Sequence, residues 1–340
     1  MHRLRTSFPI HHPGDVRVGK SIHRRSRIVS IASYVLILVG LCLFEVVSSL
    51  DNAVINAEVL GTMSPKARRW FMVYGIMFAV FIVRGLLPWL IVWLTNLQIG
   101  PIGALTATFS NDPRVHASIE RSTPILMLGG GVFLLFLFLH WLFMEDKHYG
   151  LRSEAFFQKQ GIWFYAIVSV ILVTIVGVSM KADPMLALAA VIGSSAFFIT
   201  DGFKQNAEAG EKKLLSSTSA MSDLSKILYL EIIDTTFSID GVLGAFAFTM
   251  SIPLIIAGNG LGALVVRQLT LSNIDRIKKY VYLKNGAMYS IMVLGLVMIL
   301  EGFHVEVPEL LSPVATIIII GAFFWMSVRH AKRSNADASA

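Results

Sequence analysis

The apolar residues of this chain gather into runs of about the length that a helix needs to cross a bilayer, which is about 20 residues. Of the 340 residues, 55% are hydrophobic and 15% are charged, whereas soluble proteins carry about 25% charged residues. This pattern predicts an all-α polytopic membrane protein with about nine transmembrane helices. The expected segments are approximately 28–60, 70–94, 124–144, 162–180, 184–200, 227–250, 253–271, 286–300 and 313–328.

The remaining composition narrows the classes of binding partner. The formal net charge is +7, which in a membrane protein reflects Lys and Arg in the loops rather than binding of nucleic acid. The single cysteine, Cys42, rules out an internal disulfide and argues against a thiolate site for copper or zinc. Residues 1–27 form a basic, polar tail without an apolar run, so we expect no cleaved signal peptide. We expect the lipid bilayer as a partner, no nucleic acid and no prosthetic group.

The loop charges predict an orientation. With nine crossings, the two termini lie on opposite sides of the membrane. Lys and Arg are concentrated in loops 62–69, 145–160, 201–225 and 271–284 and in the C-terminal tail 329–340, and they are scarce in the alternate loops. The positive-inside rule then places the C-terminus in the cytoplasm. The basic tail 1–27 contradicts this orientation, and we follow the loops because they are more numerous.

A short polar motif occurs twice within these apolar runs, as EVVSSLDN at 45–52 and as DTTFSIDG at 234–241. Each copy has an acid, a serine four residues later and an aspartate two residues after that. A charge at bilayer depth costs about 2.5 kcal/mol or more, so such charges are rarely without a function. The doubled motif predicts a cation site between two halves of a transporter. Its residues are Glu45, Ser49 and Asp51 in the first copy, and Asp234, Ser238 and Asp240 in the second.

The two motifs predict an inverted repeat of two three-helix units. They lie on the first and sixth segments, five crossings apart, so their helices run in opposite directions, and the paired sites are expected near the midplane. One buried arginine follows each motif, Arg84 after the first and Arg267 after the second. We expect one transporter domain over 28–328. It comprises repeat one at about 28–144, an inserted helix pair at about 162–200, repeat two at about 227–300 and a final helix at about 313–328.

The residue types indicate the kind of ion. Carboxylate, hydroxyl, amide and carbonyl oxygens suit hard divalent cations such as Mn²⁺, Mg²⁺ or Ca²⁺. On continuous helices Asp51 and Asp240 lie off the face of the other ligands, so they join the site only if the helices unwind near Asn52-Ala53 and near Gly241. Coupling of ion movement to protons is a hypothesis. The expected ligands are Glu45, Ser49, Asp51, Asn52, Glu231, Asp234, Ser238 and Asp240.

The two arginines admit two interpretations. Either Arg84 and Arg267 form buried ion pairs with Asp51 and Asp240 that only hold the bundle together, or they act in gating. In the second case a guanidinium replaces the cation when the site is empty.

These residues resemble the TerC family of integral membrane proteins over about residues 28–328. The resemblance implies Mn²⁺ export and a link to tellurium resistance, whereas the residue types alone give only a hard divalent cation. In this chain Gly241 stands where many relatives have Ser or Asn. The residues that carry the resemblance are the 45–52 motif, Glu231, Asp234, Ser238, Asp240, Arg84, Arg267 and Tyr282-Leu-Lys-Asn-Gly286.

The function expected from motif and resemblance together is a secondary transporter that exports a hard divalent cation, with Mn²⁺ as the transported ion, in the inner membrane of a bacterial cell. One alternative is a non-transporting scaffold of a tellurium or metal stress-response complex. An intramembrane aspartyl protease is disfavoured because its Gly-x-Gly-Asp pattern is absent: Asp240 follows Phe237-Ser-Ile239. We therefore expect no enzyme activity. A homo-oligomer remains open, and tellurium resistance cannot be derived from these residues.

Overall fold

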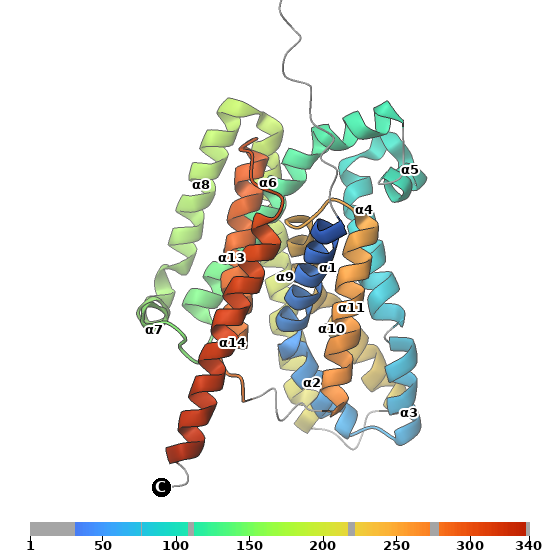
Figure 1. The fold of residues 1–340 in the computed structure, drawn as a ribbon, viewed down its shortest axis with the longest axis vertical. Helices are drawn as coiled ribbons and strands as arrows, with labels where there is room; N and C mark the ends of the chain where they lie inside the picture. The colour runs from blue at the N-terminus through green and yellow to red at the C-terminus, as the bar shows by residue number, and fades with distance from the viewer. Residues whose placement is uncertain (1–30, 76, 108–111, 217–221, 273–278, 338–340) are drawn as a thin grey trace, which may run out of the picture.

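The computed structural model describes residues 31–75, 77–107, 112–216, 222–272 and 279–337, and all regular elements within them are helices (Figure 1). The predicted fold class, an all-α polytopic membrane protein, is therefore confirmed. The tail 1–27 lies outside the described residues. The side chains of Asp51 and Asn52 also lie outside the described part of the structure, although their backbone belongs to a helix.

The first half of the chain comprises α1 (Ile31–Ser48), α2 (Leu50–Gly61), α3 (Pro65–Trp70), η1 (Phe71–Gly75), η2 (Phe78–Leu86), α4 (Leu87–Thr95), η3 (Leu97–Ile99), α5 (Gly100–Thr106) and α6 (Pro113–Met144). The second half comprises α7 (Arg152–Lys159), η5 (Gly161–Trp163), α8 (Phe164–Ala182), α9 (Pro184–Ser216), α10 (Asp223–Phe246), α11 (Ile252–Ser272), α13 (Leu283–Gly302) and α14 (Leu311–Asp337). Both η1 and η2 are π-helices, a winding that is rare and often found at functional sites.

Six helices in the described residues are long and apolar enough to cross a membrane, or up to seven if the bent pair Ile82–Thr95 and Leu97–Thr106 forms one span. This number is smaller than the nine membrane-spanning segments that the sequence suggested. Helix α10 does not pass because it carries the acids of the second motif. The apolar stretch of α11, Ile252–Gln268, is shorter than the required length.

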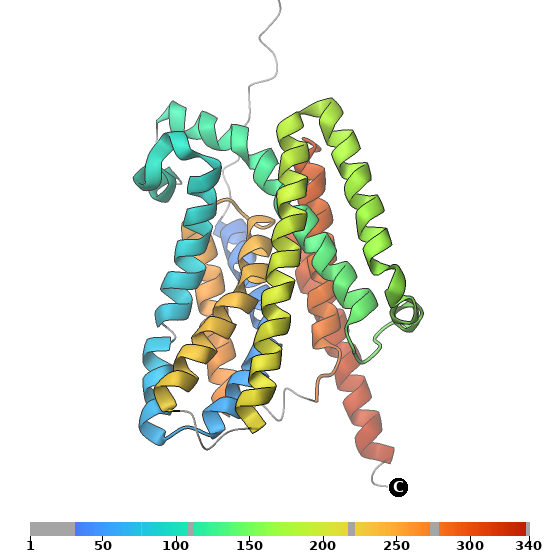
Figure 2. The ribbon, with the colours of Figure 1, turned by 180° about the vertical axis from the view of Figure 1, so that it is seen from behind.

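The helices run alternately up and down one bundle. Helix α1 runs from the upper end to the lower end in Figures 1 and 2, and α10 runs upward from the lower end (Figure 2). Helices α6 and α13 are likewise antiparallel, and α14 ends at the end of the bundle opposite to the start of α1. The directions of the two motif helices agree with those expected for an inverted repeat.

Glycines bring three helices into close backbone contact. A Cβ atom on Gly193 of α9 would overlap the carbonyl oxygen of Gly129 on α6. On another face of α6, a Cβ atom on Gly131 would lie 2.8 Å from the carbonyl oxygen of Gly295 on α13. Small residues allow helices in a membrane to approach this closely. Helices α6, α9 and α13 therefore form a tightly packed unit, which we call the glycine frame.

The run at 282–286 contributes to the packing of this fold through Asn285. Asn285 donates a hydrogen bond from Nδ2 to Glu154 Oε2 at 2.9 Å, and the Gly150 amide donates to the same oxygen at 2.8 Å. Glu154 is fully buried, and these bonds satisfy one of its two carboxylate oxygens. They attach the short helix α7 to the start of α13.

Candidate cation site

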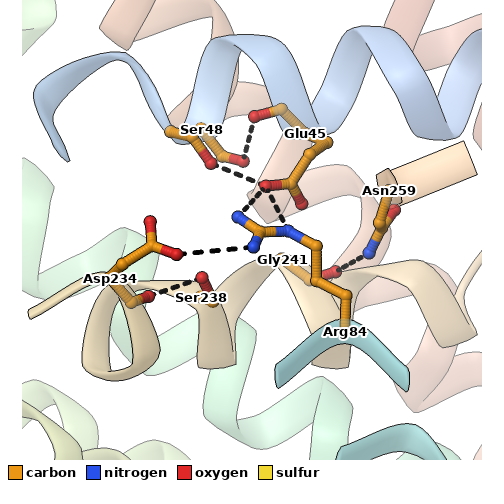
Figure 3. Close-up of polar contacts among 8 residues, drawn as sticks. Glu45, Ser48, Arg84, Asp234, Ser238, Gly241 and Asn259 are labelled. Carbon is orange, nitrogen blue, oxygen red and sulfur yellow. Dashed lines mark hydrogen bonds and ion pairs between the residues drawn. The ribbon is translucent and has the colours of Figure 1, made fainter. Parts of the chain in front are cut away.

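A buried guanidinium lies between the lead acids of the two motifs (Figure 3). Arg84 of η2 donates to Glu45 Oε1 of α1 from Nη2 at 2.6 Å and from Nε at 3.0 Å. Its Nη1 lies 3.5 Å from Asp234 Oδ2 of α10. The side chains of Arg84 and Glu45 are each 2% exposed. Three segments far apart in the sequence thus share one ion-pair cluster, which brings Glu45 and Asp234 to the same guanidinium.

Four residues after Glu45, the helix that carries the first motif is interrupted at Ser49. This residue has φ −91° and ψ 4°, so α1 ends at Ser48 and α2 begins at Leu50. The Ser49 hydroxyl donates to Glu45 Oε1 at 2.7 Å, on the same oxygen that accepts from Arg84. Ser49 therefore lies beside the acid, and its role as a metal ligand stays a prediction. The expected break at Asn52-Ala53 is wrong, because the interruption lies at Ser49.

The second motif lies on an unbroken helix, so the expected unwinding at Gly241 is also wrong. The Ser238 hydroxyl donates to the carbonyl oxygen of Asp234 at 2.5 Å and not to a carboxylate. At Gly241, a Cβ atom would lie 2.9 Å from Glu45 Oε2. The glycine thus leaves room for the Glu45 carboxylate against α10, and its carbonyl oxygen accepts from Asn259 Nδ2 at 3.4 Å (Figure 3).

Asp240 does not join this cluster, because it faces α9 and pairs with Lys204. The predicted ion pair between Asp240 and Arg267 is therefore wrong. Sequence reasoning missed Lys204 because residues 201–225 looked like a polar connector, whereas α9 continues to Ser216. Asp51 and Asn52 belong to α2, and their part in the site stays a prediction.

A second ion pair lies beside the first. Arg267 Nη2 of α11 is 3.7 Å from Glu231 Oε1 of α10, and the guanidinium lies 4.1 Å from the centre of the Phe71 ring. Glu231 is one turn of α10 before Asp234, so both acids face the same region. The two arginines thus pair with Glu45, Asp234 and Glu231 rather than with Asp240.

We expect Gly75→Ala to lower the free energy of unfolding by about 1–3 kcal/mol, because overpacking a well-filled site forces its neighbours apart. The new Cβ would overlap the Glu231 carboxylate and lie 2.9 Å from Arg267 Nη2. Thermal or denaturant unfolding in detergent measures the change. Gly61→Ala is the matched control, since nothing lies within 4 Å of its Cβ. Equal stability of the two variants would contradict the close packing around Glu231.

A cavity of about 30 Å³ adjoins the two ion pairs, enough for about two water molecules. Its lining includes Ser49, Asn56, Arg84, Asp234 and Arg267. The Asn56 Oδ1 atom is buried and has no hydrogen-bond partner among the described residues. Within that part of the chain, no three His, Cys, Asp or Glu side chains are placed to hold a metal ion. Guanidinium groups stand beside the acids instead.

A protein-family model described as "Protein of unknown function (DUF475)" matches residues 50–334. The chain belongs to the DUF475 family. The match starts just after Glu45 and Ser49 and includes Arg84, Asp234 and Arg267. The likeness to the TerC family remains a resemblance.

One curated relative of this DUF475 protein is the "Uncharacterized membrane protein YceF" of Bacillus subtilis (strain 168). The two are 34% identical over 104 residues, which is 31% of this chain and 39% of the relative, so the chain spans less than half of that protein's length. No solved structure matches. The relative and the apolar helices together indicate that this DUF475 protein is a membrane protein.

Proposed function

We propose that this DUF475 protein is a secondary transporter of a hard divalent cation, with Mn²⁺ as the transported ion. One observation supports this proposal: the carboxylates of Glu45 and Asp234 both pair with the buried guanidinium of Arg84. The acids come from the two copies of the motif, as expected for a site between two halves of a transporter. The choice of Mn²⁺ rests on the TerC resemblance alone.

In this proposal the Arg84 guanidinium occupies the place of the cation between the two acids when no ion is bound. Two carboxylates and one guanidinium leave a net charge of −1, whereas a divalent ion would neutralise both acids. Arginine stays charged in proteins, so Arg84 cannot be neutralised by losing a proton and has to move aside when the ion binds. The adjoining cavity gives space for this movement. Ser49 and Asn56 then supply a hydroxyl and an amide oxygen, which are suitable ligands for a hard cation.

The remaining expectations belong to the same proposal. The protein acts in the cell membrane of a bacterium, with its C-terminus in the cytoplasm, and it exports the ion. Its activity involves no enzymatic step, no prosthetic group and no nucleic acid, and self-association is compatible with it.

The test is ion flux in proteoliposomes that contain the purified full-length protein. Mn²⁺, Mg²⁺, Ca²⁺ and Zn²⁺ are offered separately, with empty liposomes as the control. We expect saturable Mn²⁺ flux and little Zn²⁺ flux, because zinc prefers Cys and His ligands. Absence of flux for all four ions in a well-folded preparation would contradict the proposal and favour the scaffold alternative.

A further inference from the structure

A second chain of charged side chains crosses the glycine frame, away from Arg84. Lys204 of α9 pairs with Asp240 of α10. One turn earlier on α9, Asp201 Oδ1 lies 3.6 Å from His140 Nε2 of α6. The other ring nitrogen of His140, Nδ1, lies 3.9 Å from Glu145 Oε1. Glu145 Oε2 in turn pairs with Lys284 Nζ of α13 at 2.7 Å. We call these six residues the relay.

The Glu145 end of the relay is more exposed to solvent than the Asp240 end. The side chains of Asp240 and Lys204 are 13% and 14% exposed, and those of His140 and Asp201 are 14% and 18% exposed. Glu145 reaches 34%. The relay therefore leads from a buried aspartate on a motif helix to the surface at the end of α6.

His140 is the member of the relay suited to carry a proton. Each of its two ring nitrogens faces a carboxylate, and only the doubly protonated imidazolium has an N–H for both. The ring is held by Phe164 of α8 and Phe197 of α9, whose centroids lie 5.4 Å and 5.9 Å from its own. These neighbours are uncharged. The charged groups around the ring are Glu145, Asp201, Lys204, Lys284 and, at the end of α6, Lys147.

Asp240 links the relay to the candidate cation site. It follows Asp234 by six residues on the unbroken helix α10, which is about 9 Å along the axis. Charges at this distance inside a protein are poorly screened by salt. A divalent ion beside Asp234 therefore repels the ammonium of Lys204. Asp201 lies three residues from Lys204 on α9, so the two side chains share a face of that helix.

We propose that His140 is a proton-binding site that releases its proton when a divalent cation binds beside Asp234; this inference rests on the proposed function. The cation weakens the Lys204–Asp240 pair, and Lys204 turns toward Asp201. The Lys204 ammonium then replaces the His140 imidazolium as the charge partner of the Asp201 carboxylate. The N–H bond at Nδ1 breaks, the proton passes to the Glu145 carboxylate and then to water, and His140 is left neutral. No electrons are transferred, and Lys204 keeps its charge throughout.

Glu145 is suited to the last transfer. Burial alone would raise the pKa of its carboxyl, but the pair with Lys284 and the nearby His140 and Lys204 hold that pKa below its ordinary value. Glu145 therefore stays ionised at neutral pH, accepts the proton only briefly and passes it to solvent.

The test is isothermal titration of Mn²⁺ into the detergent-solubilised full-length protein, at about pH 6.5, near the ordinary pKa of histidine. Running it in two buffers with different ionisation enthalpies gives the number of protons released for each ion bound. We expect His140→Gln to bind Mn²⁺ and to release fewer protons than wild type, by up to about one. Asp201→Asn tests the same step without removing the ring. The matched control is His330→Gln, whose ring packs against Tyr282 away from the relay.

The outcomes separate the two proposals. Reduced proton release in His140→Gln or Asp201→Asn, with His330→Gln unchanged, supports the inference. Normal Mn²⁺ binding with wild-type proton release in both relay variants overturns the inference and leaves the transporter proposal intact. Failure of the wild type to bind Mn²⁺ overturns both. If His140→Gln does not fold, Asp201→Asn decides the question alone.

Discussion

Replacing Arg84 by glutamine is expected to lower the free energy of unfolding of the cation-free protein by about 3–5 kcal/mol, the usual result of removing one partner from a buried ion pair. The cause is the pair of carboxylates left behind. Glu45 and Asp234 would lie inside the protein with no guanidinium between them, although Glu45 would keep the hydrogen bond from the Ser49 hydroxyl.

Unfolding in detergent, with and without Mn²⁺, measures this effect. A bound ion stabilises the folded state according to its affinity, and in Arg84→Gln it need not displace a guanidinium. We therefore expect Mn²⁺ to raise the melting temperature of the variant by more than it raises that of wild type. Arg114→Gln is the control, since Arg114 pairs with Asp112 on the surface and is 92% exposed. A variant as stable as wild type, with no added response to Mn²⁺, would show that Arg84 does not hold the place of a cation.

The second large effect is expected for Glu45→Gln, which should reduce Mn²⁺ flux by about 100-fold. Glutamine keeps the shape of the side chain but removes one of the two negative charges that would balance the ion. Loss of one buried charge partner costs about 3 kcal/mol, which corresponds to about 100-fold in binding. The fold should survive, because Arg84 keeps its contact with Asp234.

Flux in proteoliposomes, normalised to the amount of folded protein from gel filtration, gives this comparison. Glu306→Gln is the matched control, because Glu306 is exposed in the loop after α13 and lies outside the site. Glu45→Asp keeps the charge on a shorter side chain and should retain part of the flux. Undiminished transport by Glu45→Gln would show that Glu45 is not a ligand of the ion. The proposed function would then lose its main supporting observation.

The sequence predicted which segments come together better than it predicted their ion-pair partners. Long apolar runs and the doubled motif were enough for the fold class, for the opposite directions of α1 and α10, and for Glu45, Ser49 and Asp234 as neighbours. Ion-pair partners depend on how helices pack, which no local pattern encodes. Arg84 therefore contacts the lead acids of both motifs, although the sequence suggested Asp51 as its partner.

Lys204 is the clearest case of an ion-pair partner that the sequence did not predict. It lies in a stretch with many polar and small residues, which is the usual composition of a connector. In the structure α9 continues through this stretch to Ser216, and Lys204 on it pairs with Asp240 of α10. Helical spacing of Asp201 and Lys204 was the available signal, since i and i+3 share one face.

The glycine frame has a mechanical consequence. Backbones that touch, as those of α6 and α9 do at Gly129 and Gly193, cannot slide or rotate past each other without steric overlap. Any shape change that opens the candidate site to one side of the membrane must then be carried by the remaining helices. The three helices of the frame would keep their positions relative to one another. The moving part would be α1, η2, α10 and α11, which carry both arginines and their acids.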